Sequence, residues 1–118
     1  MKLDAFQALC RSLPATTYVN QWGGSDVYKV GGKIFAIAAA FGPDAGYAYT
    51  FKVSEMSYEL LIEQGLARPA PYLARAKWVQ ITGPDAMSDA DLKAYVVQAH
   101  GLISGRLTRA TRKALGLA

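Results

Sequence analysis

The stretch that decides the fold is residues 27–40, which read VYKVGGKIFAIAAA. Two apolar, β-forming runs flank a Gly-Gly pair. Glycine reaches positive φ without a clash at Cβ, and the central positions of a two-residue hairpin turn need positive φ. Gly31 and Gly32 are therefore predicted to form the tip of a β-hairpin, whose arms are residues 26–30 and 33–40.

The second arm of this hairpin is apolar on both faces. Side chains alternate between the two faces of a strand. This alternation predicts the odd-numbered residues from Phe35 to Ala39 on one face and the even-numbered ones from Ile34 to Ala38 on the other. A strand with two apolar faces is typical of the middle of a sheet. The small alanines leave room for a helix to pack closely.

Further strands are predicted on both sides of the hairpin. Residues 16–22 are β-branched and aromatic, and residues 47–53 alternate with aromatic side chains on one face. Turn clusters at 42–46 and 83–85 separate elements. A proline-stiffened loop at 67–72 is followed by residues 77–82, which read as a last strand; the full set of predicted strands is 16–22, 26–30, 33–40, 47–53 and 77–82.

Four helices are predicted from periodicity and caps. The first is capped by Asp4 and ends before Pro14, with an apolar face that includes the single cysteine, Cys10. Ser54 is a good N-cap for the second helix and Ser88 for the third. The core face of the third helix is predicted to be Leu92, Val96, Ala99 and Ile103, and Gly101 and Gly105 weaken its end. Residues 106–115 form a further helical segment.

These elements predict an α+β fold. The strands are consecutive and hairpin-linked, so the sheet is expected to be mainly antiparallel with helices on one face. The predicted order is helix, three strands, helix, one or two strands, helix, helix. At 118 residues, the chain 1–118 is most simply one domain.

The positive charge of the chain is concentrated in its second half. The net charge is +4, but residues 1–66 carry five basic and six acidic residues, whereas residues 67–118 carry eight basic and three acidic ones. Such asymmetry indicates a polyanion as partner. Solubility alone explains it equally well.

Composition also predicts the compartment. No apolar run reaches the ~20 residues that a membrane span needs, and the N-terminus has no apolar signal segment. A single cysteine rules out an internal disulfide framework and suits a reducing cytoplasm. We therefore expect a cytoplasmic monomer or homodimer with no membrane partner.

The sequence lacks the residue motifs that the usual catalytic and metal sites need. His100 is the only histidine and Cys10 the only cysteine, which leaves no two-histidine metal site and no zinc site. Neither Gly-Gly pair leads into the Gly-Lys-Ser/Thr start of a phosphate loop. We predict a protein that is not an enzyme and has no cofactor, with His100 in a structural role and Cys10 as a core residue.

The first of two basic groups surrounds the proline loop. Cations position phosphates, and aromatic faces stack on unpaired bases. Trp78 lies on a half-buried strand, and we expect it to serve the core first, whereas Tyr72 is expected to be reachable. The candidate contacts are Arg68, Tyr72, Arg75, Lys77 and Trp78.

The second basic group lies near the end of the chain and has no acid within it. In a continuous helix Arg106, Arg109 and Lys113 share one face, which would grip a nucleic-acid backbone. The same residues suit a solvated face favoured by the helix dipole, and the pattern does not separate the two. The candidate contacts are Arg106, Arg109, Arg112 and Lys113.

The motifs in their order resemble the MmcQ/YjbR family of small bacterial proteins. The similar segments are YKVGGKIFA at 28–36, TFKV at 50–53, Pro71-Tyr72 and KWV at 77–79, and residues 88–107 have the spacing of the family's C-terminal helix. This resemblance implies a double-wing-like fold of order α-β(3)-α-β(2)-α and a DNA-binding label.

Three functions remain open at this point. The leading hypothesis is a non-enzymatic protein that binds nucleic acid, most simply DNA, mainly through phosphates. The second is a protein-interaction module, because the fold resembles that of secretion chaperones, which bind polypeptide and commonly dimerise. The third is a small-molecule-binding protein that uses the loop from Tyr72 to Trp78.

Overall fold

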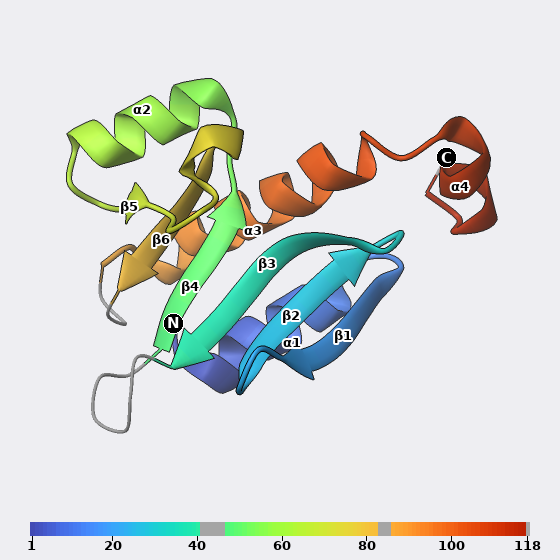
Figure 1. The fold of residues 1–118 in the computed structure, drawn as a ribbon, viewed down its shortest axis with the longest axis horizontal. Coiled ribbons are helices and arrows are strands. Elements are labelled where there is room, and N and C mark those ends of the chain that lie inside the picture. Colours follow the sequence, from blue (N-terminus) through green and yellow to red (C-terminus); the bar gives the residue numbers. More distant parts are fainter. Residues whose placement is uncertain (41–46, 83–85, 118) are drawn as a thin grey trace.

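The computed structural model describes residues 1–40, 47–82 and 86–117, and in it one six-stranded sheet packs against helices (Figure 1). The turn clusters predicted at 42–46 and 83–85 lie outside these residues. None of the helices in the described part is both long and apolar enough to cross a bilayer. The elements are α1 (Leu3–Ser12), β1 (Thr16–Gln21), β2 (Ser25–Val30), β3 (Lys33–Ala40), β4 (Tyr47–Lys52), α2 (Glu55–Glu63), β5 (Arg68–Pro69), the 3-10 turn η1 (Ala74–Ala76), β6 (Trp78–Thr82), α3 (Asp89–Ser104) and α4 (Arg109–Ala114).

The sheet has the strand order β1-β2-β3-β4-β6-β5, and each neighbouring pair is antiparallel. The α+β class with a mainly antiparallel sheet is thus confirmed. Four strands precede α2, not three, because each extended run between residues 16 and 52 forms its own strand. The segment predicted as a proline-stiffened loop contains β5, and Pro69 is tolerated there because β5 is an edge strand.

The Gly-Gly turn is confirmed. Gly31 and Gly32 have φ of +58° and +79°, and Val30 pairs with Lys33 across a two-residue loop. Both central residues therefore adopt the left-handed conformation that matches the twist of a hairpin. β3 lies between β2 and β4, as its two apolar faces predict.

A β-bulge changes the expected faces of β3. Tyr28 pairs with Ala36, but the next residue, Lys29, pairs with Ile34, so Phe35 is an extra residue in β3. Such an insertion interrupts the alternation locally. Phe35 is consequently buried with Ala36, and Ile34 lies on the opposite face, so the predicted placement of these two residues is wrong. Further along the strand the alternation is as predicted, with Ala38 buried in the core.

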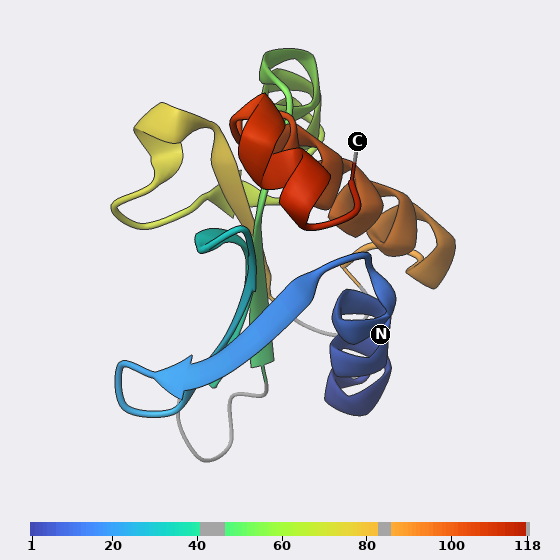
Figure 2. The same ribbon diagram turned by 90° about the vertical axis from the view of Figure 1, so that its right-hand side faces the viewer.

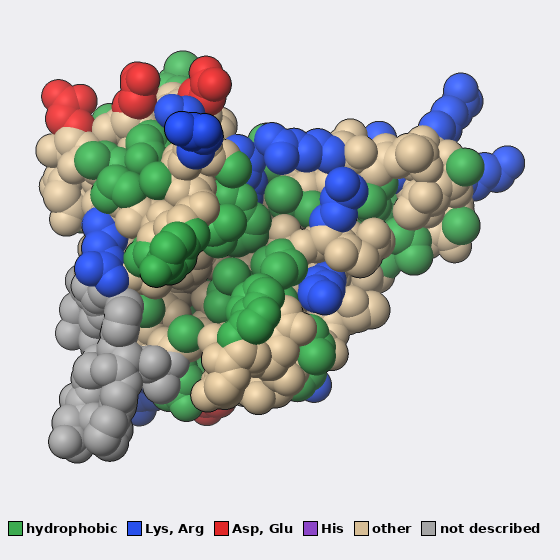
Figure 3. Space-filling view, viewed as in Figure 1, with side chains coloured by type: hydrophobic (Ala, Val, Ile, Leu, Met, Phe, Trp, Pro, Cys, Tyr) green, Lys and Arg blue, Asp and Glu red, His purple; other side chains and the backbone are tan. Residues whose placement is uncertain are grey.

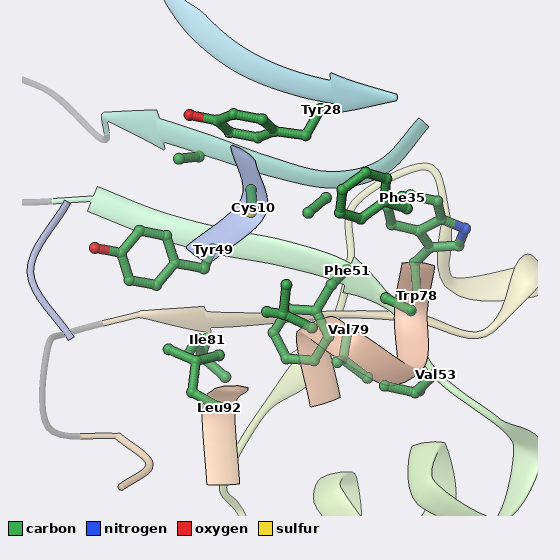
Figure 4. Close-up of a cluster of buried hydrophobic side chains, with 14 of the residues drawn as sticks. Cys10, Tyr28, Phe35, Tyr49, Phe51, Val53, Trp78, Val79, Ile81 and Leu92 are labelled. Atoms are coloured by element: carbon green, nitrogen blue, oxygen red, sulfur yellow. The ribbon is translucent and has the colours of Figure 1, made fainter. Parts of the chain in front are cut away.

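α1 and α3 cover the same face of the sheet (Figure 2). The ring of Phe6 in α1 stacks on Tyr49 of β4 at 4.1 Å between centroids, and α3 packs on β3 and β4. Figure 4 shows how side chains from α1, α3 and the central strands fill the space between the helices and the sheet. This layer is the hydrophobic core, with Phe35, Phe51 and Leu92 fully or almost fully buried.

The single cysteine and the single histidine both have structural roles. Cys10 is buried in the core, and burial raises the pKa of its thiol from 9.0 to about 12, so the thiol stays neutral. His100 of α3 is buried, its Nε2–H donates to the carbonyl of Pro14 at 2.7 Å, and its ring meets Phe35 edge-on. The expected core position of Cys10 is confirmed, and these contacts give His100 a structural role that joins α3 to the residues after α1.

A buried carboxylate ties α1 to the outer strands. Asp26 of β2 accepts hydrogen bonds from Tyr18 and Asn20 of β1 and from Gln7 of α1, at 2.6, 3.0 and 2.9 Å. Burial by itself would raise the pKa of Asp26, but these three donors outweigh it, and the pKa lies below its ordinary value.

Helix starts follow from side-chain caps with one exception. The hydroxyls of Ser54 and Ser88 accept from the N–H groups of Ser57 and Asp91, as their sequence positions predict. The first helix begins two residues earlier than predicted: Lys2 is the N-cap residue, and Asp4 lies in the first turn. That helix does end before Pro14.

The last predicted helix is shorter than expected. α3 ends at Ser104 and α4 begins only at Arg109, because Thr108 is extended and caps α4 by accepting from the N–H of Thr111. Arg106 therefore lies in the connection between two helices. The expectation that Arg106, Arg109 and Lys113 share one helical face is wrong, since an N-cap interrupts the periodicity between them.

Candidate binding groove

The face of the sheet opposite α1 and α3 is hollowed into a groove. A cavity of about 860 Å³ lies on this face. The β1–β2 turn and the β5–η1 segment project from the sheet on this side, one from each half of the molecule (Figure 2). Green hydrophobic side chains gather in the hollow between them (Figure 3). The cavity is lined by Trp22, Ser25, Lys33, Ile34, Ile37, Ala39, Thr50, Pro71, Tyr72, Leu73, Trp78, Gln80, Ile103 and Arg106.

The β-bulge helps to form the apolar floor of this groove. Ile37 and Ala39 reach the groove through the ordinary alternation of β3, and Ile34 joins them because the extra residue shifts it to this face. The opposite alternation keeps Ala36 and Ala38 in the core. The register of one strand thus supplies both the core and the floor of the groove.

A hydrogen-bonded row of polar side chains crosses the floor from its β5 edge. Arg68 Nε donates to Gln80 Oε1 at 2.9 Å, and Gln80 Nε2 donates to Thr50 Oγ1 at 3.1 Å. Gln80 and Thr50 are both buried, so their polar groups need these partners. Arg68, a predicted contact residue, is thereby oriented by β6.

Two aromatic side chains stand exposed beside the groove. Trp22 follows β1 and is 64% exposed, and Tyr72 precedes η1 and is fully exposed. Both have a positive φ, of +54° and +65°, which is uncommon outside glycine. Strained positions of this kind persist where the surrounding structure holds them, and they gather at binding sites. Tyr72 is reachable, as predicted.

Trp78 serves the core and the groove together. It is only 7% exposed and belongs to the buried cluster, which confirms its expected role as a core residue. Its side chain also lines the cavity. A ligand in the groove would therefore meet a fixed indole on the sheet and two exposed rings, Trp22 and Tyr72, on the flanking turns.

Basic side chains border the groove and continue past it. Lys33 and Arg106 line the groove itself, and Arg106 also lines a neighbouring cavity of about 300 Å³ together with Arg75 and Lys77. The exposed Lys and Arg side chains form a band along one side of the hollow in Figure 3. The structure thus brings residues of the two predicted basic groups together at Arg106.

The remaining predicted cations lie on α4 and line neither cavity. Arg109 and Lys113 are exposed, and Arg112 is partly buried. Their contact with phosphate stays a prediction that now has no geometric link to Arg106.

The predicted contacts did not include Trp22 and Lys33 of the groove, or Lys52, which lines only the neighbouring cavity. Trp22 falls at the end of a predicted strand, and the Gly23-Gly24 pair after it is a signal for an exposed turn. Lys52 falls within a predicted strand, and nothing in the local sequence shows that this strand ends beside Arg75 and Arg106. In the described ranges, no three acidic, His or Cys side chains are grouped to hold a metal ion.

The fold and the groove define a class: small α+β proteins with an open antiparallel sheet that carries α1 and α3 on one face and a groove on the other. The sequence pattern of the YjbR family matches residues 11–102, so the chain belongs to the YjbR family. This result confirms the resemblance to the MmcQ/YjbR family.

A solved structure agrees with this assignment. The crystal structure of Deinococcus radiodurans protein DR2400, whose domain is described as DUF419, is similar with a TM-score of 0.87 and 22% identity, and the alignment covers 99% of this chain and 89% of that one. At this identity the likeness shows the fold alone. No curated protein matches the chain.

Proposed function

We propose that this YjbR-family protein is a non-enzymatic nucleic-acid-binding protein that holds a single strand in the groove. The observation that carries the proposal is the pair of exposed rings, Trp22 and Tyr72, beside an apolar hollow bordered by Lys33 and Arg106. Aromatic faces stack on unpaired bases, while a basic border follows the phosphates. The expected binding through phosphates is kept, and the base stacking expected of Tyr72 is extended to Trp22.

A single strand fits this surface better than a duplex does. Stacking needs bases that are unpaired, and the aromatic side chains here flank a concave sheet rather than a protruding helix or ribbon that enters a groove of DNA. The basic helical face expected to grip a duplex is also broken at Thr108. The localisation that suits this function is the cytoplasm, as the composition predicts.

The test is a titration of short labelled oligothymidylate, oligouridylate and duplex DNA at several salt concentrations. Tyr72→Ala should weaken single-strand binding by roughly 5- to 150-fold, the equivalent of ~1–3 kcal/mol for one stacked base. Tyr72 is fully exposed, so the free energy of unfolding should not change. Tyr47→Ala is the matched control, because Tyr47 is an exposed tyrosine that does not line the groove.

Salt dependence separates the cations from the rings. Lys33→Ala and Arg106→Ala should each lower the slope of log affinity against log salt by roughly 0.7, the value for one phosphate contact on a single strand. Lys93→Ala, an exposed change on α3, should leave the slope unchanged. If the parent binds no oligonucleotide at low salt, or prefers the duplex, the proposal is wrong.

A small apolar or aromatic molecule is the second candidate occupant. The cavity of about 860 Å³ lies within the range of small-ligand sites, and apolar side chains dominate its lining. Native mass spectrometry of the purified protein distinguishes the two, since a small ligand would appear as a fixed added mass. Binding of that ligand without any binding of oligonucleotide would favour this second function.

A further inference from the structure

The smaller cavity beside the groove is lined by four cations. It lies where β4 ends, α2 begins and η1 passes over them, and its volume is about 300 Å³. Its charged lining is Lys52, Arg75, Lys77 and Arg106, against a single carboxylate, Glu55. Within the described ranges, none of the four cations has a carboxylate within ion-pair distance. Four like charges held together with one opposite charge raise the free energy of the empty site.

Lys52 is the buried cation of this cavity. Its side chain is only 6% exposed, and its ammonium donates one hydrogen bond to the carbonyl of Ala76. An ammonium has three donors, so two remain for another acceptor. Burial, and then the charge of Arg106, lower the pKa of Lys52. Lysines are rarely buried to this degree unless an acceptor or a counter-charge meets them.

The walls around Lys52 are held in place. The N–H of Val53 donates to the carbonyl of Lys77 at 3.0 Å, which joins the end of β4 to the residue after η1. Lys77 adopts a left-handed conformation with φ of +63°, and its ammonium lies 4.7 Å from the centroid of the Tyr58 ring. The first turn of α2, which also borders the cavity, adds the positive end of a helix dipole.

We propose that this cavity binds a phosphate monoester. Four cations suit one compact dianionic group better than the singly charged diesters of a continuous backbone. The small, partly enclosed volume also suits a terminal group, because a continuous backbone would have to enter the cavity and leave it again. Arg106 lines this cavity and the groove, so one ligand can place its base in the groove and its terminal phosphate on Lys52. The ligand class is therefore the phosphorylated end of a strand or a mononucleotide; the strand-end form rests on the proposed function.

The test compares oligothymidylates of one length that carry a 5′-phosphate, a 3′-phosphate or only hydroxyl ends. One phosphorylated end should bind on the order of tenfold more tightly than the hydroxyl-ended strand, the equivalent of one added charge-assisted hydrogen bond. Lys52→Met keeps the length of the side chain but removes its charge, and it should abolish this preference while hydroxyl-ended binding persists. Lys93→Met is the matched control and should retain the preference.

Two further measurements keep the inference separate from the proposed function. Arg75 is exposed, so Arg75→Ala should reduce the end preference without a loss of folding, even if Lys52→Met alters stability. Thymidine monophosphate, titrated while thermal unfolding is followed, should stabilise the parent and not Lys52→Met. That result without any oligonucleotide binding would support the monoester site and overturn the single-strand function.

Other outcomes overturn the inference. Equal affinity of the parent for phosphorylated and hydroxyl-ended strands would leave the groove as a nucleic-acid site and remove the cavity from it. The cavity is also excluded as the phosphate site if Lys52→Met and Arg75→Ala both keep the full end preference. It is excluded likewise if thymidine monophosphate stabilises the parent and Lys52→Met equally.

Discussion

Gly31 shows how a single residue serves two purposes, of which the sequence displays one. Its positive φ is the reason that the turn could be predicted from residues 27–40 alone. Its second role is a close approach: a Cβ on Gly31 would lie 2.6 Å from Cδ1 of Leu107, which follows α3. Gly32 has no atom within 4 Å of the same position. Gly31 and Leu107 are far apart in the chain, so the local sequence pattern could not predict this close approach.

This difference predicts unequal costs for two neighbouring substitutions. Gly32→Ala should lower the free energy of unfolding by about 1 kcal/mol, the usual strain of a non-glycine residue at positive φ. Gly31→Ala should cost about 1–3 kcal/mol more, because the added methyl group overlaps a buried leucine. Urea denaturation measures both values.

A variant at Leu107 tests the cause. In a Leu107→Ala background the extra penalty of Gly31→Ala over Gly32→Ala should largely vanish, since the overlapping methyl groups are gone. Equal penalties for both glycines in the parent background would show that the turn alone, and not the approach of Leu107, determines the role of Gly31.

At the scale of elements, prediction succeeds where the cause is local. Ser54 and Ser88 cap the helices that follow them because the cap and the N–H that it accepts from lie three residues apart. Thr108 is the same kind of signal, but the helical spacing of Arg106, Arg109 and Lys113 across it concealed the cap. The bulge at Phe35 was invisible, since it depends on how β2 pairs with β3 and not on the composition of either strand.

The buried carboxylate of Asp26 predicts how the edge of the sheet responds to pH. Asp26→Asn should cost about 2 kcal/mol at neutral pH, because three donors from α1 and β1 lose a charged acceptor. The folded-state pKa is lowered, so the contribution of the carboxylate is present above its unfolded pKa and is lost as pH falls through the folded value.

The measurement is the difference in unfolding free energy between the parent and Asp26→Asn from neutral pH down into the acid range. That difference should shrink as the parent carboxyl becomes protonated. Asp91→Asn, an exposed change in the first turn of α3, should show a much smaller difference. If the difference in unfolding free energy between the parent and Asp26→Asn stays constant with pH, the charge of Asp26 does not contribute to these hydrogen bonds.

For the whole molecule, the sequence predicted the face of the sheet that the helices cover, but not the groove on the opposite face. Apolar periodicity indicated the helices and the strands that they cover, so the α+β class and the core could be inferred. The groove is assembled from Trp22, β3, the loop at Tyr72 and the end of α3, which are distant in sequence. Only the antiparallel order of six strands brings them to one face. The basic groups were therefore found as residues but not as a surface.

This arrangement makes the two tryptophans reporters of groove occupancy. The chain has two, Trp22 and Trp78, and both line the groove, one of them exposed and the other buried. Oligothymidylate should quench the fluorescence of both, because stacked or adjacent bases contact each indole. Trp22→Phe keeps an aromatic ring on the β1–β2 turn and leaves Trp78 as a single buried reporter with blue-shifted emission.

Titration of the parent and of Trp22→Phe with the same strand checks this expectation. Quenching in both proteins at similar affinity would place the ligand over the floor and the flank of the groove together. Quenching that disappears in Trp22→Phe would confine contact to the turn, and a complete lack of quenching in the parent would locate the ligand elsewhere.

The bulge in β3 also bears on how the length of this chain can vary over evolution. Loss of one residue elsewhere in β3 would turn every later side chain of the strand over and exchange core for groove. Loss of Phe35 alone would leave Lys29 opposite Ile34 and Tyr28 opposite Ala36, now as consecutive pairs of a regular ladder. Position 35 is thus the point in the strand where a deletion preserves both faces, at the expense of one buried ring. When related sequences are aligned, single-residue deletions in this strand are expected at position 35.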